Sequence, residues 1–327
     1  MTTPDDTPPI VAILIGRNEG QRLVRCLASV AGLGRVIYVD SGSTDGSVAA
    51  AEAAGAEVVS LDMNQPFTAA RARNAGLARI AGSGAEFIQF IDGDCELDPG
   101  WIGTAGAFLR ANPGVAVACG RRRERFPEAS VYNRLTDLEW DTPVGQARSC
   151  GGDALMRADA VIAVGGYRDD LIAGEEPEMC VRLRAAGWTV WRLDAEMTLH
   201  DAAMTRFAQW WNRMRRGGHA FAEGAALHGA PPERHGVAGT RRAVIWGLAL
   251  PCLALLAAAL VSPWALLLLL AYPAQIVRMA LRDRAEGRFA WVRAAFTLIG
   301  KLPEMLGVLE FAWGRLIRRR SGLIEYK

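Results

Sequence analysis

Short apolar runs alternate with helically periodic stretches along the first part of the chain. The apolar runs predict buried strands, and the stretches between them predict helices with one apolar face. We expect strands at Ile10–Ile15, Val36–Val39, Glu57–Leu61 and Phe87–Ile91, and helices at Glu19–Val30, Ser47–Ala54 and Thr68–Ala81. Strands alternating with helices predict an α/β fold, with a mostly parallel sheet covered by helices on both faces.

The pattern beyond residue 100 is less regular. The charged segment Arg121–Arg148 predicts no regular element, and Gly151–Ala163 is typical of a strand or turn that leads into a helix. The other expected elements are helices at Trp101–Ala111, Pro177–Ala186 and Thr205–Glu223, and strands at Val115–Gly120, Trp188–Leu193 and Ala195–Leu199.

Two apolar stretches near the end of the chain, Val244–Val261 and Trp264–Met279, are separated by Ser262 and Pro263. Each is about as long as a bilayer crossing requires, so they predict a transmembrane hairpin. A buried hairpin of a soluble protein is the alternative. Arginines flank both ends of the pair, which predicts that both ends lie on the cytoplasmic side.

The last segment, Trp291–Ile317, mixes charges with Phe, Leu and Trp. It predicts an amphipathic helix on the membrane surface with a break at Pro303. A third crossing would bury too many charges.

Composition restricts the class of partner and the compartment. The net charge is +2 and no basic stripe is interleaved with aromatic residues, which argues against nucleic acid as a partner. The six cysteines show no metal-binding spacing, and the polar N-terminus has no signal-peptide core. We therefore expect free thiols and a catalytic part that faces the cytoplasm.

Two carboxylates stand where the strand Phe87–Ile91 ends. Asp92 and Asp94 are separated only by Gly93, so in extended backbone their side chains would point the same way. Convergent carboxylates attract a hard divalent cation such as Mg²⁺ or Mn²⁺, which bridges phosphate oxygens. Gly93 would let a ligand approach the backbone closely. An ordinary Asp-Gly turn is the alternative.

Further polar groups allow two interpretations each. They are Asp40 at the end of the second strand, Arg73 on the third helix, the acidic pair Glu175 and Glu176, His200 after a strand, and Arg213 and Arg216 on a later helix. They could bind a nucleotide, hold a metal or supply a base. Alternatively, they could cap helices, line a solvated face, fill a structural site or face acidic lipid.

The order of these motifs is more specific than any one of them. The sequences NE, DSGSTDGS, ARNAG, DGD, GGY and GEEPEMCVRLR occur in that order. Together they resemble the family-2 glycosyltransferases of the GT-A (Rossmann-like) fold, over roughly Pro9 to Gly218.

The resemblance implies an inverting, metal-dependent transfer from a nucleoside-diphosphate sugar. By position it puts Asn18 and Glu19 near the nucleoside, Asp40 on the nucleobase, Asp92 on the ribose or sugar, and Asp94 at the metal. It makes Glu176 the general base, with Glu175 as the alternative. The family usually has Glu-Asp at this pair. From the residues themselves we expect further donor contacts from Arg73, Asn74, Arg213 and Arg216, and further metal ligands in Asp92 and His200.

The membrane hairpin favours a lipid-linked saccharide acceptor in glycan assembly, with transfer to polyprenyl phosphate as the alternative. The sequence QWWNR at 209–213 lacks the Gln-x-x-Arg-Trp motif of many relatives, which argues against processive polymerisation. A sugar-nucleotide nucleotidyltransferase and a non-catalytic membrane scaffold are the alternatives from other classes. The expected organisation is a disordered segment at 1–8, a catalytic domain at 9–230, a hairpin at 231–285 and a surface helix with a basic tail at 286–327.

Overall fold

A computed structural model describes residues 10–80 and 82–318 of the chain. These residues divide into two compact units. The first unit runs to Leu171 and includes Glu175–Thr205, and the second comprises Ile172–Gly174 and the residues from Arg206 onward. The predictions for segment 1–8, for Ala81 and for the tail at 319–327 lie outside the described residues.

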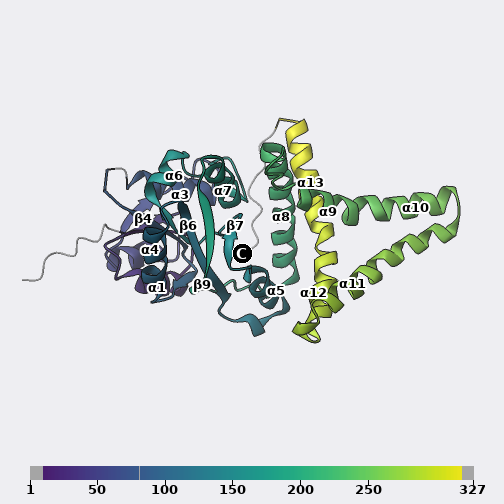
Figure 1. The fold of residues 1–327 in the computed structure, drawn as a ribbon, viewed down its shortest axis with the longest axis horizontal. Coiled ribbons are helices and arrows are strands. Elements are labelled where there is room, and N and C mark those ends of the chain that lie inside the picture. Colours follow the sequence, from purple (N-terminus) through teal and green to yellow (C-terminus); the bar gives the residue numbers. More distant parts are fainter. Residues whose placement is uncertain (1–9, 81, 319–327) are drawn as a thin grey trace, which may run out of the picture. The chain divides into compact units, whose positions relative to one another are not determined.

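A mixed nine-stranded sheet forms the centre of the first unit (Figure 1). Its strands follow the order β3-β2-β1-β4-β8-β6-β9-β5, and β7 pairs with another part of β9. The strands β1 to β4 are mutually parallel, β8 is antiparallel between β4 and β6, and β9 runs parallel to β6. The strands are β1 (Ile10–Gly16), β2 (Arg35–Asp40), β3 (Glu57–Ser60), β4 (Phe87–Asp92), β5 (Cys95–Leu97), β6 (Val115–Glu124), β7 (Gly145–Ala147), β8 (Ala154–Arg157) and β9 (Thr189–His200).

Helices cover both faces of this sheet. Along the sheet, β2 lies next to β1 and β3 next to β2, so the chain first proceeds toward one edge. It then crosses back over β2 and β1 to form β4 on the other side of β1. Because such crossovers are right-handed, α1 and α2 lie on one face of the sheet and α3 lies on the other. The core between them contains Ile13, Tyr38, Phe87, Phe90 and Trp101, all fully buried. The helices are α1 (Gln21–Val30), α2 (Ser47–Ala53), α3 (Ala69–Ala78), α4 (Trp101–Ala111), η1 (Pro127–Ala129), α5 (Val131–Trp140), α6 (Ala158–Ala163) and α7 (Glu175–Ala185).

The predicted fold class is confirmed, and the predicted elements up to residue 111 lie within a few residues of the observed ones. The sheet contains more antiparallel pairing than the pattern indicated, because β5, β7 and β8 all run against their neighbours. The predictions missed α5, β5 and β7, ended β6 at Gly120 instead of Glu124, and divided β9 into two strands.

The second unit is helical. Its long helix α8 packs against α13, and glycines permit this contact: a Cβ on Gly218 or Gly307 would lie 1.9 Å from a backbone oxygen of the other helix. The elements are α8 (Phe207–His228), α9 (Val237–Val244), η2 (Ile245–Ala249), α10 (Leu250–Leu260), η3 (Pro263–Leu270), α11 (Ala271–Arg282), η4 (Arg284–Glu286), α12 (Phe289–Ile299) and α13 (Lys301–Leu316).

The predicted helix over Trp291–Ile317 is interrupted at Gly300, between α12 and α13, and not at Pro303. Pro303 instead lies in the first turn of α13, where a missing N–H removes no intrahelical hydrogen bond.

Two continuous helical stretches of this unit are long and apolar enough to cross a membrane, Val237–Leu260 with 24 residues and Pro263–Arg282 with 20 residues. They meet at a turn where Ser262 Oγ accepts a hydrogen bond from Trp264 N, and they diverge from it (Figure 1). Only 11% of the first and 6% of the second apolar window is buried. Within the described residues, these two helices are therefore far more exposed than the core helices of a soluble protein.

Candidate active site

The polar residues of the predicted site follow parallel neighbouring strands. Gly16 at the end of β1 is in register with Asp40 of β2, and Ile15 is in register with Asp92 of β4. The chain leaves β1 toward β2 and later returns to β4 on its other side, so the strand order reverses at β1. This is where ligands bind in open α/β sheets.

Asp94 and His200 are brought together by the short strand β5. Cys95 pairs with His200 across the antiparallel β5–β9 ladder, and Asp201 N donates to the backbone oxygen of Asp94 at 3.0 Å. His200 Nε2 lies 3.3 Å from Asp94 Oδ2, while its Nδ1 lies 3.3 Å from Glu124 Oε2. All three side chains are buried. Glu124 thus fixes the ring so that Nε2 faces Asp94.

Asp92 has a different environment, because two arginines hold it. Its Oδ1 accepts from Arg73 Nη2 at 2.7 Å, and its Oδ2 accepts from Arg122 Nη2 at 3.2 Å. Burial raises the pKa of Asp92, but the two guanidinium groups outweigh burial and hold that pKa below its usual range. The ligand atoms of Asp94 and His200 cluster with Cys95, whereas Asp92 clusters with Cys95 and Asp153. The predicted three-residue metal set is therefore not assembled as one cluster.

Gly93 lies close to the backbone of β1. Its N–H donates to Ile15 O at 2.8 Å, and a Cβ here would lie 3.1 Å from that oxygen. The close approach at Gly93 is therefore made by β1 of the same chain.

Arg73 is almost completely buried and links two acidic residues. Besides Asp92, it donates through Nη1 to Glu175 Oε1 at 2.7 Å. A Cβ on Gly152 would lie 2.8 Å from both Arg73 Nη2 and Asp92 Oδ2, so only glycine fits beside this pair. Both amino groups of Arg73 thus bind protein carboxylates.

Asn74 has a structural contact. Its Oδ1 accepts from Tyr167 N at 2.8 Å and its Nδ2 donates to Tyr167 O at 2.7 Å. The side-chain amide of Asn74 thus binds both the backbone N–H and the backbone carbonyl of Tyr167, the last residue of the Gly-Gly-Tyr turn.

Glu176 is buried at the start of α7. Its Oε1 accepts hydrogen bonds from Cys150 N at 2.6 Å, Cys150 Sγ at 2.9 Å and Cys180 Sγ at 3.0 Å. Burial raises the pKa of Glu176, although these hydrogen bonds oppose the rise. A carboxylate with a raised pKa is suited to accept a proton near neutral pH.

Asp40 shapes the turn that follows β2. Its Oδ2 accepts from Gly42 N and Ser43 N, both at 2.9 Å, and its Oδ1 accepts from Tyr38 Oη at 3.1 Å. The loop after β1 meets this turn, because Thr44 N donates to Asn18 Oδ1 at 2.7 Å.

Glu19, the next residue of the same loop, pairs with Arg22 at 2.8 Å. Arg213 and Arg216, by contrast, belong to α8 in the second unit. The structure gives no test of the donor-binding roles predicted for these residues.

The sequence predictions missed four residues in this network: Glu124, Arg122, Asp153 and Cys95. Arg122 and Glu124 stand two apart on β6, so both face the site from a segment that was expected to be irregular. Asp153 is fully buried and accepts from Asp92 N at 2.9 Å and from Thr198 Oγ1 at 2.9 Å. The alternation Arg122-x-Glu124 was the available signal.

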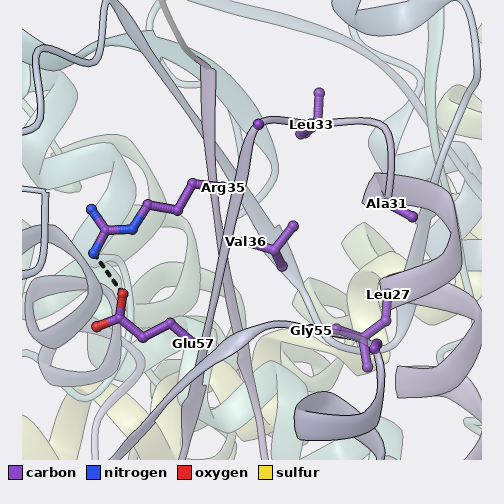
Figure 2. Close-up of a pocket in the computed structure, with 9 residues that line it drawn as sticks. Leu27, Ala31, Leu33, Arg35, Val36, Gly55 and Glu57 are labelled. Atoms are coloured by element: carbon purple, nitrogen blue, oxygen red, sulfur yellow. Dashed lines mark hydrogen bonds and ion pairs between the residues drawn. The ribbon is translucent and has the colours of Figure 1, made fainter.

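One pocket lies at the opposite, amino-terminal edge of the sheet. Its volume is about 220 Å³, and it is lined by the end of α1 and the starts of β2 and β3. Figure 2 shows Arg35 and Glu57 facing each other on its wall, 2.5 Å apart, with Val36 and Leu27 beside the cavity. None of the site residues described above lines this pocket.

The fold and the chemistry at the strand ends define a class of protein. Residues 12–159 match the family described as "Glycosyl transferase family 2". The chain has the α/β fold of GT-A glycosyltransferases, and the family match and the relatives described below support a glycosyltransferase.

Similar proteins agree with this assignment. The chain is 27% identical over 233 residues to a pre-mycofactocin glycosyltransferase of Mycobacterium tuberculosis, covering 67% of this chain and 48% of that protein. It is 28% identical over 172 residues to the succinoglycan biosynthesis protein ExoA of Rhizobium meliloti, covering 49% of this chain and 52% of that protein. The chain thus spans about half the length of these curated relatives.

A solved structure shows the same fold. The mannosyltransferase PcManGT from Pyrobaculum calidifontis, in complex with GDP-Man and Mn2+, has a TM-score of 0.61 and 17% identity. The alignment covers 96% of this chain and 90% of that one.

Proposed function

We propose that this protein transfers a sugar, with inversion, from a nucleoside-diphosphate sugar to a lipid-linked saccharide during assembly of a cell-surface glycan. The observation that carries the proposal is the buried Asp94–His200 pair at the carboxyl end of β4, with Glu124 behind it. ExoA, a similar protein, is named for succinoglycan biosynthesis, and the mannosyltransferase of similar fold was solved in complex with GDP-Man and Mn2+.

Asp94 and His200 would hold the divalent cation. One carboxylate and one imidazole suit Mn²⁺ better than Mg²⁺, which prefers oxygen ligands. When bound, the cation would stabilise negative charge on the departing diphosphate. Asp92 would contact the sugar or ribose of the donor, with Arg73 and Arg122 fixing its position.

Glu176 would be the general base. Three donors fix its Oε1, so we assign the proton-accepting role to Oε2. Oε2 would take the proton of the acceptor hydroxyl as that oxygen attacks the anomeric carbon and the diphosphate leaves from the opposite side. Glu175, tied to Arg73, is the alternative base.

The acceptor and the location are inferred from the second unit. Large apolar side chains on its two long helices are exposed, with Leu260 at 80% and Val261 at 84%. Exposed apolar surface of this extent fits lipid better than water. The flanking arginines would keep both ends of the hairpin, and the catalytic unit, on the cytoplasmic face of the inner membrane.

The test uses the full chain in detergent. We expect Mn²⁺ together with one of UDP-, GDP- or TDP-sugar to raise the melting temperature, because a ligand that binds only the native state stabilises it. Asp94→Asn should lose the Mn²⁺-dependent part of the rise. Asp170→Asn, a change at an exposed surface ion pair, should keep it. An unchanged Mn²⁺ effect in Asp94→Asn would refute the assignment.

A transfer assay then separates the acceptors. Transfer to a lipid-linked saccharide should stop in Glu176→Gln, since an alcohol acceptor needs a base. If Glu176→Gln instead remains active with polyprenyl phosphate, whose oxygen is already ionised, the saccharide acceptor is wrong.

A further inference from the structure

Two thiols and the carboxylate of Glu176 form a cluster in the first unit. Cys150 Sγ and Cys180 Sγ lie 2.9 and 3.0 Å from Glu176 Oε1, and the two sulfurs are 3.9 Å apart. Glu176 and Cys180 are four residues apart and share one face of α7, while Cys150 comes from the loop before β8. Sugar transfer as proposed uses the carboxylate but gives no reason for two thiols.

We propose that Cys150, Cys180 and Glu176 form a binding site for Zn²⁺ or a similar thiophilic divalent cation. The site is distinct from the oxygen and imidazole donors of Asp94 and His200. Its three ligand atoms all lie within 4.8 Å of one another.

The geometry favours a metal over a disulfide. Zn–S bonds of about 2.3 Å in a tetrahedron put two sulfurs about 3.8 Å apart. The two sulfurs already stand 3.9 Å apart. A disulfide would require them to close to about 2.05 Å.

The donor types also favour zinc. Thiolates select Zn²⁺ strongly over Mg²⁺ and Mn²⁺, which prefer oxygen. A Cys₂Glu set leaves the fourth tetrahedral position for water.

Binding must release protons. Burial raises the pKa of Cys150 well above its ordinary value. The hydrogen bond from Cys150 lowers the pKa of Cys180, but burial and the Glu176 carboxylate together outweigh it, and the pKa is raised to about 11. Both groups are thus thiols without metal. Zn²⁺ would replace one proton on each sulfur, so two protons pass to solvent for each ion bound and no redox change occurs.

The consequence for activity rests on the proposed function. Zn²⁺ bound through Oε1 would lower the basicity of the whole carboxylate, Oε2 included, so zinc at this site would inhibit transfer. A cation at Asp94 and His200 would support it.

The test uses Co²⁺ as a spectroscopic probe on the full chain in detergent. Co²⁺ bound to thiolate gives a near-ultraviolet charge-transfer band that oxygen and imidazole ligands do not give. We expect one equivalent of Co²⁺ to produce the band and Zn²⁺ to abolish it. Cys150→Ser and Cys180→Ser should each lose the band. Cys252→Ser, at an exposed cysteine, and Asp94→Asn should keep it.

A second measurement needs no variant. Alkylation of the native protein followed by peptide mapping should show Zn²⁺ protecting Cys150 and Cys180 together. Absence of a thiolate band in the unmodified chain, or alkylation unaffected by Zn²⁺, would overturn the proposal. Both readouts measure metal binding and do not depend on sugar transfer. A failure of the proposed function would therefore leave them unchanged and would be seen only in the transfer assay.

Discussion

Replacing Arg73 by Met should destabilise the catalytic unit strongly. The guanidinium is 3% exposed and makes two contacts of 2.7 Å, to Asp92 and to Glu175. Removing one partner of a buried ion pair costs about 3–5 kcal/mol when the remaining charge stays buried. The two carboxylates left here are partly exposed, Asp92 by 26% and Glu175 by 12%. Asp92 keeps Arg122 at 3.2 Å, so we expect the lower part of this range, about 3–4 kcal/mol. For a domain of this size the melting temperature should fall by roughly 6–16 °C.

The matched control is Arg79→Met, the same substitution in an ion pair near the end of the same helix. Arg79 contacts Glu57 at 2.6 Å, but its side chain is 56% exposed. Exposed pairs contribute about 0–1 kcal/mol, so its melting temperature should change little. Thermal unfolding followed by tryptophan fluorescence measures both variants. Equal shifts in Arg73→Met and Arg79→Met would refute the reasoning.

The effect of Arg73 should also depend on pH. Burial raises the pKa of Asp92, but Arg73 and Arg122 together depress it in the folded state. A depressed carboxylate pKa contributes stability above the unfolded value of about 3.9, and this contribution is lost as pH falls through the folded pKa. The difference between wild type and Arg73→Met should therefore be full at pH 7 and narrow below about pH 4. A difference that widens on acidification would show that another interaction is responsible.

Three further variants test the site. Glu124→Gln should weaken the apparent affinity for Mn²⁺ about 10- to 100-fold, because His200 loses the carboxylate that orients it. A Mn²⁺ titration of donor turnover measures this affinity, and an unchanged affinity would contradict the orienting role of Glu124. Gly152→Ala should lose most transfer activity, since its Cβ would lie 2.8 Å from the Arg73–Asp92 pair, whereas Gly103→Ala, with open space around it, should keep full activity. Glu176→Gln should still bind nucleotide sugar by thermal shift but lose transfer to an alcohol acceptor.

The sequence predicted the part of the fold built on β1 to β4 well, for a physical reason. The strands β1, β2 and β4 are buried on both faces, so they are continuous apolar runs that end in polar turns. The positions of Asp40, Asp92 and Asp94 at strand ends follow directly from these runs. Because β1, β2 and β4 are parallel, their carboxyl ends, and with them these aspartates, lie along the same edge of the sheet.

The partners of these residues were harder to predict. The end of β6 carries the charged run Arg121–Glu124, which is typical of a solvated loop, and it forms a strand because Arg122 and Glu124 meet charged groups of the site. The strand β5 has only three residues and exists through its pairing with β9. Both strands pair with β9, whose paired residues lie more than 70 positions further along the chain, and local periodicity does not report such contacts.

The contrast between Asp92 and Asp94 bears on which carboxylate would hold the proposed cation. Asp92 already contacts two guanidinium groups, and a divalent cation at the same oxygens would be repelled by both. Asp94 instead faces the Nε2 of His200, whose other nitrogen lies by Glu124. In the proposed function, Asp94 and His200 would therefore hold the cation, while Asp92 is held in place by Arg73 and Arg122. The buried Arg73 contributes to this arrangement. Its hydrogen bonds to Asp92 and Glu175 fix these two carboxylates relative to each other without a ligand.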